Sequence, residues 1–228
     1  MKILAIETST MLGGVAIADE KGLIAETRLN VKSTHSERLM ATIDEQLRQA
    51  ELVLGDIDAF AVASGPGSFT GLRIGLSTAK GLCYATGKPL VMVPTLEAFA
   101  RSFPFSSHPV CIMLDARRGE VYAAVFQWDR GFMKLLDEVS AAPEDLFKNV
   151  DSPVVLAGEG AQVYRERLVA LLGERALFAP LVTMVPSPAN VAMIGHEKAL
   201  QGAFTDASSA EPLYIRKSEA EVKWSKKR

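Results

Sequence analysis

The sequence has 228 residues, of which 48% are hydrophobic and 23% are charged, and its formal net charge at pH 7 is -2. This composition suits a folded chain with one or two sizeable cores, and a charge close to zero excludes a global attraction to a polyanion such as RNA. No apolar run approaches the roughly 18 residues of a membrane span, and the two cysteines lack the CxxC spacing of a zinc or disulfide framework, so a reducing cytoplasm is the expected location.

The first half of the chain predicts a β-meander followed by a helix. Three short β-type runs come first, at residues 3–7, 14–18 and 23–29. A helix is expected from about residue 36 to 50, where Thr34 and Glu37 fit a capping box. Leu39, Met40, Ile43, Leu47 and Ala50 follow at helical spacing down one face.

A second helix follows a buried strand and a tight turn. The strand is expected at residues 59–63 and the turn at Gly65-Pro66-Gly67. Ser68 can cap the helix, and its end is expected at Gly87, since glycine is the usual residue in that position. Residues 90–93 are then expected to form a further strand.

The second half of the chain repeats this outline, which predicts two α/β domains. Residues 102–109 are the richest turn segment, so the domains are expected at 1–104 and 105–210, with a charged, loosely held tail at 211–228. Strands are expected at 110–114, 121–128, 132–139 and 154–157, and helices after Pro143 and at about 162–172 and 188–203.

Glycines recur inside the second helix, where they are unfavourable. Gly71 and Gly75 each cost about 1 kcal/mol relative to alanine. With Gly67, Ala79 and Cys83 they recur every four residues and therefore lie on one face of the helix. Such a bare stripe lets a neighbouring segment approach closely, and that segment belongs either to the same chain or to another subunit.

Arg73 is a second unusual residue in this helix. A cation in the first turn opposes the helix dipole unless an anion compensates it, and a partner carboxylate or a phosphate would do so. Alternatively, the side chain extends into water and needs no partner.

The segment Gly65-Pro66-Gly67-Ser68-Phe69-Thr70-Gly71-Leu72-Arg73-Ile74-Gly75 resembles the signature of the bacterial TsaB family, also called YeaZ. Four further places resemble that family in order and spacing: Ile3 to Ser9, His35, Asp115 to Tyr122, and Pro212 to Arg216. The resemblance covers nearly the whole chain.

The resemblance implies an α/β, two-domain actin-like ATPase fold (ASKHA, RNase H-like) with mixed sheets flanked by helices. It also implies a non-catalytic scaffold or activator that binds the catalytic subunit TsaD, with TsaE as third component. That complex transfers a threonylcarbamoyl group to the tRNA adenosine beside the anticodon. The resemblance further implies that the chain self-associates as a homodimer through the same surface. It also implies that tRNA is contacted only through the complex and that no cofactor is bound.

Two groups of residues are expected to form functional contacts. The partner surface is expected on the two helices of the first domain, at His35, Leu39, Gly67, Phe69, Thr70, Gly71, Arg73, Ile74, Gly75, Thr78 and Leu82. Cleft or nucleotide-proximal contacts are expected at Glu7, Thr8, Ser9, Asp115, Arg117, Arg118 and Glu120. A Gly75→Leu substitution is expected to leave the fold largely intact while weakening partner binding.

The sequence itself offers little for catalysis. A phosphate cradle needs glycine-rich turns beside carboxylates, but Glu7 to Thr10 contains no glycine and residues 115–118 carry two arginines. His35, His108 and His196 lack HxxxH or HExxH spacing, so neither a metal site nor a metalloprotease is expected.

Two rival functions are kept. An actin-like small-molecule kinase would use Glu7 and Asp115 to bind Mg-ATP. An RNA-binding module would instead use Trp224 of the tail, with the basic residues Lys223, Lys226, Lys227 and Arg228.

Overall fold

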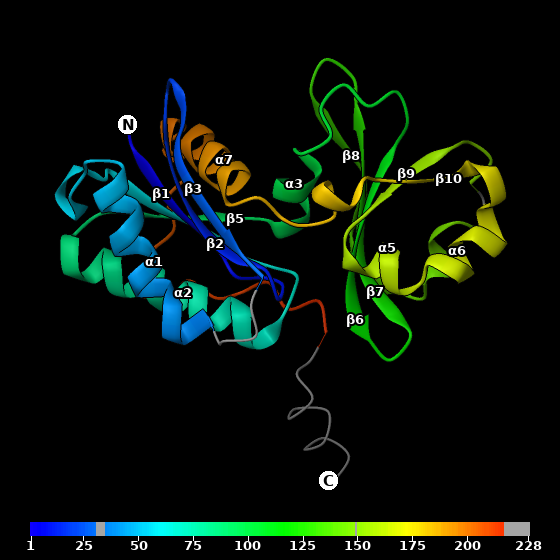
Figure 1. Ribbon diagram of the computed structural model, residues 1–228, viewed down its shortest axis with the longest axis horizontal. Coiled ribbons are helices and arrows are strands. Elements are labelled where there is room, and N and C mark those ends of the chain that lie inside the picture. Colours follow the sequence, from blue (N-terminus) through cyan, green and yellow to red (C-terminus); the bar gives the residue numbers. More distant parts are fainter. Residues whose placement is uncertain (31–34, 149, 217–228) are drawn as a thin grey trace, which may run out of the picture.

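The protein is described by a computed structural model, which covers residues 1–30, 35–148 and 150–216. Two five-stranded sheets lie side by side, each with helices packed against it (Figure 1). The strand order is β3-β2-β1-β4-β5 in the first sheet and β10-β9-β6-β7-β8 in the second. Both sheets are mixed, because each combines an antiparallel meander with parallel strands.

The first sheet is built around a fully buried central strand. Its strands are β1 (Ile3–Glu7), β2 (Gly13–Asp19), β3 (Gly22–Leu29), β4 (Ala59–Ala63) and β5 (Leu90–Val93). Leu4 and Ile6 of β1 face one core, and Ile3 and Ala5 face another on the opposite side of the sheet. Since both faces are covered, β1 is apolar from Ile3 to Ile6 instead of alternating.

Three helices cover the first sheet. The helices α1 (His35–Gln49) and α2 (Phe69–Thr86) pack on the face of Leu4 and Ile6, and α7 (Pro188–Leu200) packs on the other face. The start of α1 agrees with the predicted helix, although Thr34 of the expected capping box lies outside the described residues. Met40 is exposed whereas Leu39 and Ile43 are buried, so these residues do not share one face as expected.

The second sheet is covered by short helices. Its strands are β6 (Val110–Arg117), β7 (Glu120–Trp128), β8 (Phe132–Ala141), β9 (Val154–Ala157) and β10 (Ala176–Phe178). The helices of this half are α3 (Thr95–Ala100), α4 (Pro143–Leu146), α5 (Glu159–Val163) and α6 (Arg165–Leu172). Three-residue 3-10 turns follow at Gly173–Arg175 and Leu181–Thr183, and a third lies in the first half at Leu54–Asp56. The single helix expected at 162–172 is two helices that meet at Tyr164, and β10 was not expected because three residues carry no detectable alternation.

Helix α7 returns to the first sheet after the chain has formed the second. Glu26 on β3 fixes its start, accepting hydrogen bonds from Ser187 Oγ at 2.9 Å and from the Ala189 amide at 3.0 Å. Val191 and Ile194 are then buried with Ile3 in the core of the first half. The expected domain 105–210 placed this helix in the second half, because an apolar face does not specify which sheet will cover it. The domain boundaries at 104 and 210 otherwise stay predictions.

Candidate interaction surface and cleft

Helix α2 begins directly beside the end of β1. Ser68 is its N-cap: its hydroxyl accepts a hydrogen bond from the Gly71 amide at 3.3 Å, and its own amide donates to the Ser9 carbonyl at 2.6 Å. At the other end Gly87 adopts a left-handed conformation with φ of 70° and donates its amide to Cys83. Both ends agree with the sequence prediction.

The glycine stripe of α2 is a contact within the chain. A β-carbon on Gly71 would overlap the carbonyl oxygen of Thr8, and one on Gly75 would overlap the Thr8 hydroxyl. That hydroxyl donates a hydrogen bond to the Gly71 carbonyl at 2.8 Å. Gly67 is equally close to Ser9. The expectation that these glycines receive another subunit is therefore wrong, and so is the expectation that Gly75→Leu would leave the fold intact.

Two further residues of the expected partner surface belong to the core. Leu39 and Leu82 are buried beneath the two helices, together with Ile43 and Leu76. Both lie on the helices expected to bind the partner, but their side chains point toward the sheet. The side chain of His35, which was also expected at this surface, lies outside the described residues.

The accessible side of α1 and α2 is a different row of residues, which we call the outer helix face. It consists of Met40, Thr70, Arg73, Ile74, Ser77, Thr78, Gly81 and Tyr84, all exposed or partly exposed. Met40 and Tyr84 are 55% and 68% exposed, and a β-carbon on Gly81 would meet nothing within 4 Å. Sequence reasoning missed Met40, Ser77, Gly81 and Tyr84, although the positions 70, 74, 77, 81 and 84 recur at helical spacing.

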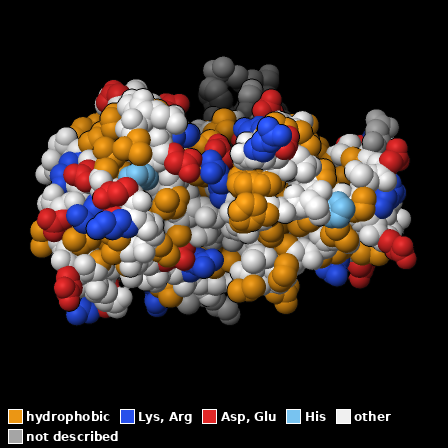
Figure 2. Space-filling model, turned by 90° about the horizontal axis from the view of Figure 1, so that it is seen from above, with side chains coloured by type: hydrophobic (Ala, Val, Ile, Leu, Met, Phe, Trp, Pro, Cys, Tyr) orange, Lys and Arg blue, Asp and Glu red, His pale blue; other side chains and the backbone are white. Residues whose placement is uncertain are grey.

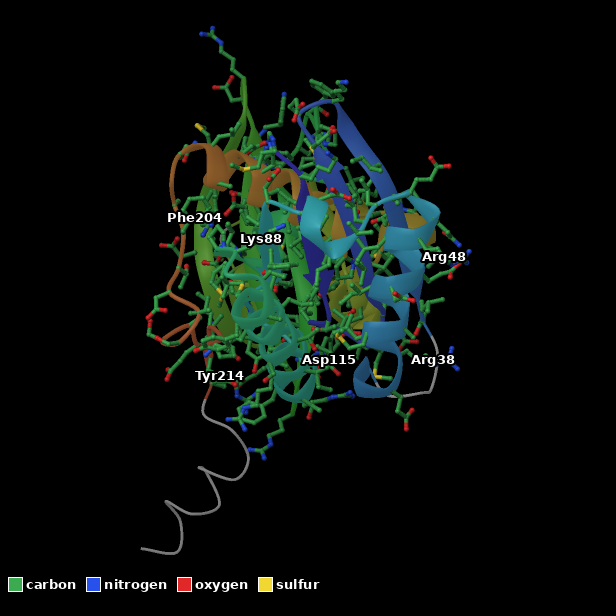
Figure 3. The ribbon with its side chains drawn as sticks, turned by 90° about the vertical axis from the view of Figure 1, so that its left-hand side faces the viewer. Arg38, Arg48, Lys88, Asp115, Phe204 and Tyr214 are labelled. Atoms are coloured by element: carbon green, nitrogen blue, oxygen red, sulfur yellow. The ribbon has the colours of Figure 1, made fainter. Side chains whose placement is uncertain are left out.

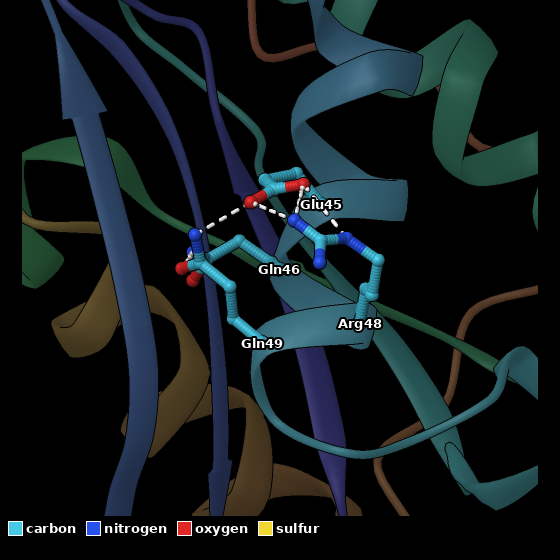
Figure 4. A network of polar contacts seen from close by, with 4 residues as sticks. All are labelled: Glu45, Gln46, Arg48 and Gln49. Atoms are coloured by element: carbon cyan, nitrogen blue, oxygen red, sulfur yellow. Dashed lines mark hydrogen bonds and ion pairs between the residues drawn. The ribbon is translucent and has the colours of Figure 1, made fainter.

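The polar side of α1 is occupied by contacts within the helix. Arg48 donates to both carboxylate oxygens of Glu45, and Gln49 donates to the same group at 2.6 Å (Figure 4). These hydrogen bonds hold the pKa of Glu45 below its usual value. Arg38 and Arg48 project from α1 on the side away from α2 (Figure 3). The polar groups of Glu45, Arg48 and Gln49 are therefore already paired with one another.

Arg73 is compensated by aromatic rings. Its guanidinium lies 3.8 Å from the centre of the Phe69 ring, and its Nε donates to the Tyr214 hydroxyl at 2.9 Å. The rings of Phe69 and Tyr214 are themselves 4.8 Å apart. Neither the expected anion nor free hydration is needed. The expectation that the tail is loosely held is also wrong at Tyr214, which has these partners, while residues 217–228 lie outside the described part of the chain.

A cleft of about 450 Å³ lies between the two halves. The first half contributes Thr10, Met11 and Pro66 to Phe69, the second half Leu114 to Arg118, Tyr122 and Glu159, and the C-terminal segment Leu213 to Arg216. The turn that enters the cleft is tight, because Arg117, Arg118 and Gly119 all have positive φ, at 65°, 57° and 84°.

The charged groups of the cleft pair with one another. Asp115 forms an ion pair with Arg117 at 3.2 Å and accepts hydrogen bonds from the Arg117 amide and from Tyr164 Oη. Burial, with the nearby Asp115 charge as a smaller cause, raises the pKa of Glu159. The predicted residues Asp115, Arg117 and Arg118 therefore do line the cleft, while Glu120 borders it through an ion pair with Arg216.

Glu7, Thr8 and Ser9 do not line the cleft, contrary to expectation. All three are buried beneath the start of α2. Glu7 Oε1 accepts a hydrogen bond from the Ser9 amide at 2.5 Å, whereas Glu7 Oε2 and Ser9 Oγ have no partner. Burial raises the pKa of Glu7 to about 7, and the hydrogen bond from the Ser9 amide opposes this shift. The carboxyl group is poorly placed to reach a ligand.

Charge is distributed evenly on the visible surface. Basic and acidic side chains alternate with apolar ones on the face drawn in Figure 2. Within residues 1–30, 35–148 and 150–216, no group of three or more His, Cys, Asp and Glu side chains is arranged to hold a metal ion. No helix in these ranges has the length and apolar character needed to cross a bilayer. Trp224 and the basic residues around it lie outside the described part of the chain.

Comparisons with known proteins agree with this architecture. A family model described as TsaD, tRNA N6-adenosine threonylcarbamoyltransferase, matches residues 24–224. The chain is 31% identical to a "tRNA threonylcarbamoyladenosine biosynthesis protein TsaB" of Bacillus subtilis over 98% of both chains. It is 29% identical to the protein of the same name in Escherichia coli, over 99% of this chain and 98% of the relative.

Solved structures extend the comparison to the fold. YeaZ from Pseudomonas aeruginosa has a TM-score of 0.79 at 26% identity, covering 93% of this chain and 99% of the other. The ethanolamine utilization protein EutJ from Carboxydothermus hydrogenoformans has a TM-score of 0.54 at 15% identity, over 86% of this chain and 90% of the other. The expected actin-like α/β fold with mixed sheets is thereby confirmed.

The two kinds of glycine in α2 predict opposite effects of the same substitution. Gly71→Ala would force a methyl group into the Thr8 carbonyl and is expected to lower the free energy of unfolding by about 2 kcal/mol or more. Gly81→Ala should raise it by about 0.5–1 kcal/mol, because its site is open and alanine favours the helix. Urea unfolding of both variants beside the wild type tests this; equal effects at the two sites would contradict the assignment of the inner and outer faces.

Burial of Glu7 predicts a pH-dependent stability. Since the pKa is raised to about 7 in the folded state from 4.5, the folded protein holds a proton that the unfolded chain loses between these values. The contribution of this proton to the free energy of unfolding is fully present below about pH 4.5 and is lost as pH rises through 7. Glu7→Gln, which is always neutral, should be more stable than wild type at pH 8 by an amount on the order of 3 kcal/mol and similar to it at pH 4. Unfolding curves from pH 4 to 8.5 measure this, and parallel pH profiles of the two proteins would refute it.

Proposed function

The chain belongs to the TsaB family, and from this premise we propose that it acts in tRNA threonylcarbamoyladenosine biosynthesis as a non-catalytic scaffold or activator subunit. Its principal partner in this proposal is a TsaD-type catalytic subunit, with a TsaE-type ATPase as third component. The complex transfers a threonylcarbamoyl group to the adenosine beside the tRNA anticodon, and tRNA meets this chain only within the complex. Self-association uses the same surface as partner binding.

The observation that carries the proposal is the outer helix face. Ser77 and Gly81 have little or no side chain, so a helix of a partner can approach α2 closely there. Met40 on α1 and Tyr84 on α2 add exposed apolar surface, and large exposed apolar side chains are common in energetically important contacts. Arg73 lies at one end and can also meet a carboxylate of the partner.

The cleft supports a non-catalytic role. Relatives that bind Mg-ATP need carboxylates and backbone amides that face the phosphates. Here Glu7 is enclosed under α2, and Asp115 is paired with Arg117 and Tyr164. Arginine side chains also occupy the turn where close backbone approach to a phosphate would favour glycine. The rival function as a small-molecule kinase therefore finds no arrangement of groups that favours it.

Partner binding is tested by placing a bulky side chain at Gly81, where the outer surface of α2 is bare. Gly81→Leu should weaken both self-association and binding to the TsaD-type protein of the same organism at least tenfold, while the free energy of unfolding does not decrease. Ala170→Leu, which enlarges an exposed residue on α6, is the matched control and should bind normally. Affinities come from calorimetry and the mass of the complexes from light scattering. Normal binding by the stable Gly81→Leu variant would exclude the outer helix face as the contact.

Nucleotide binding is tested on the isolated chain. Titration with Mg-ATP in a calorimeter is expected to give no saturable heat at micromolar protein, because the cleft acids are buried or paired. Asp115→Ala is the control for any signal that appears. Saturable micromolar binding in the wild type that disappears in this variant would support the kinase instead.

A further inference from the structure

The C-terminal segment Leu213 to Arg216 runs along the cleft and contacts both halves of the molecule. On the first half, the Leu213 amide donates a hydrogen bond to the Ser64 carbonyl at 2.7 Å. A β-carbon on Gly65 would lie 2.6 Å from the Leu213 carbonyl oxygen, so glycine is needed at this position, where φ is 113°. The segment is therefore seated tightly between β4 and α2.

The same segment holds the second half through Arg216. Its guanidinium donates to the Ala116 carbonyl at 3.1 Å and forms an ion pair with Glu120 at 3.0 Å. Ala116 lies near the end of β6 and Glu120 at the start of β7, so the two partners flank the tight turn at the edge of the cleft. Glu120 in turn accepts a hydrogen bond from Ser140 on β8. Arg216 thus connects the C-terminal segment to three strands of the second sheet.

The two halves also meet at a second place, at α3, whose Ala98 is buried in the core of the first half. Leu96 and Phe99 of this helix are buried in the core of the second sheet, with Ile112 and Phe126. Figure 1 shows α3 between the two sheets, on the opposite side from the final described residues, drawn in red. One connection is thus a packed apolar core, and the other is a short polar segment across the cleft.

These two connections differ in how easily they break. Separating α3 from the second sheet would expose large apolar side chains, which is strongly unfavourable. The contacts of Arg216 are exposed in part, and water can replace them at little cost. An opening motion would therefore keep α3 in place and release Arg216, which is the pattern of a hinge and a fastening point.

Arg73 connects this segment to the outer helix face. Its side chain belongs to that face, yet it donates to Tyr214 and lies over Phe69, which lines the cleft. A partner carboxylate bound by Arg73 would compete with the Tyr214 hydroxyl for the same guanidinium. A ligand that binds one state better than another shifts the population toward it.

We propose that Leu213 to Arg216 form a latch that keeps the cleft closed, and that a partner bound at the outer helix face releases it through Arg73. The second part rests on the proposed function. Release would separate the β6–β7 turn from α2 and enlarge the cleft, so the arrangement of the two halves would respond to the partner.

The latch can be tested with a pair of dyes on the full-length chain. Lys21→Cys in the β2–β3 turn and Glu174→Cys after α6 place one exposed thiol on each half. The native Cys83 and Cys111 are buried, and burial raises the pKa values of their thiols to about 11 and 12, so only the new cysteines react near pH 7. Single-molecule energy transfer then reports the distance between the halves.

The expected result is one narrow distance distribution for the latched protein. Arg216→Ala should raise the fraction of molecules at longer distance at least threefold, and Arg216→Lys should restore part of the closed population because it keeps the charge beside Glu120. Tyr214→Phe, which keeps the ring but loses the hydroxyl that accepts from Arg73, should open the cleft to a smaller extent. Distributions identical to wild type in Arg216→Ala would overturn the latch.

Addition of the TsaD-type partner tests the latch and the proposed function independently. Binding should increase the open fraction of the wild type and leave that of Arg216→Ala nearly unchanged. If the partner binds and the distances stay the same, the coupling through Arg73 is wrong while the proposed function stands. If the partner does not bind, the proposed function fails, and the Arg216→Ala result without partner still decides the latch.

Discussion

The close contact between α2 and the end of β1 determines most of what this molecule presents to its surroundings. The helix lies so near the strand that Gly71 has no room for a side chain above the Thr8 carbonyl. This approach covers Glu7, Thr8 and Ser9 and removes them from the cleft. It also fixes the rotation of α2, because the glycine row must face inward, and Ser77, Gly81 and Tyr84 are turned outward as a result.

The cleft follows from the same contact. Where a phosphate-binding relative would need open backbone and free carboxylates, this chain has a covered strand end on one side and a turn of paired charges on the other. The polar groups that remain in the cleft are largely engaged with each other and with the C-terminal segment.

Much of the fold was predictable because its signals are local. The meander at residues 3–29 and the caps at Ser68 and Gly87 depend on neighbouring residues alone. The site was less predictable, because the glycine spacing indicates that some segment packs closely on the helix but not whether it belongs to this chain or to a partner. Gly71 and Gly81 are both glycines inside a predicted helix, and only the position of β1 shows which of them is closely approached. Contacts across 100 residues, such as Arg216 with Ala116, leave no local signal.

The return of α7 to the first sheet has a consequence for the architecture of the gene product. The second sheet, at residues 110–178, is formed between β5 and α7, so the chain returns to the first half at Ser187 only after the second sheet is complete. A fragment that stops near residue 104 would leave Ile3 and Ala61 bare, because Gly195 and its neighbours on α7 normally lie against them. The first half therefore lacks α7 until the residues of the second sheet have been synthesised. A nascent chain leaving the ribosome cannot complete its amino-terminal unit until most of the polypeptide has been made.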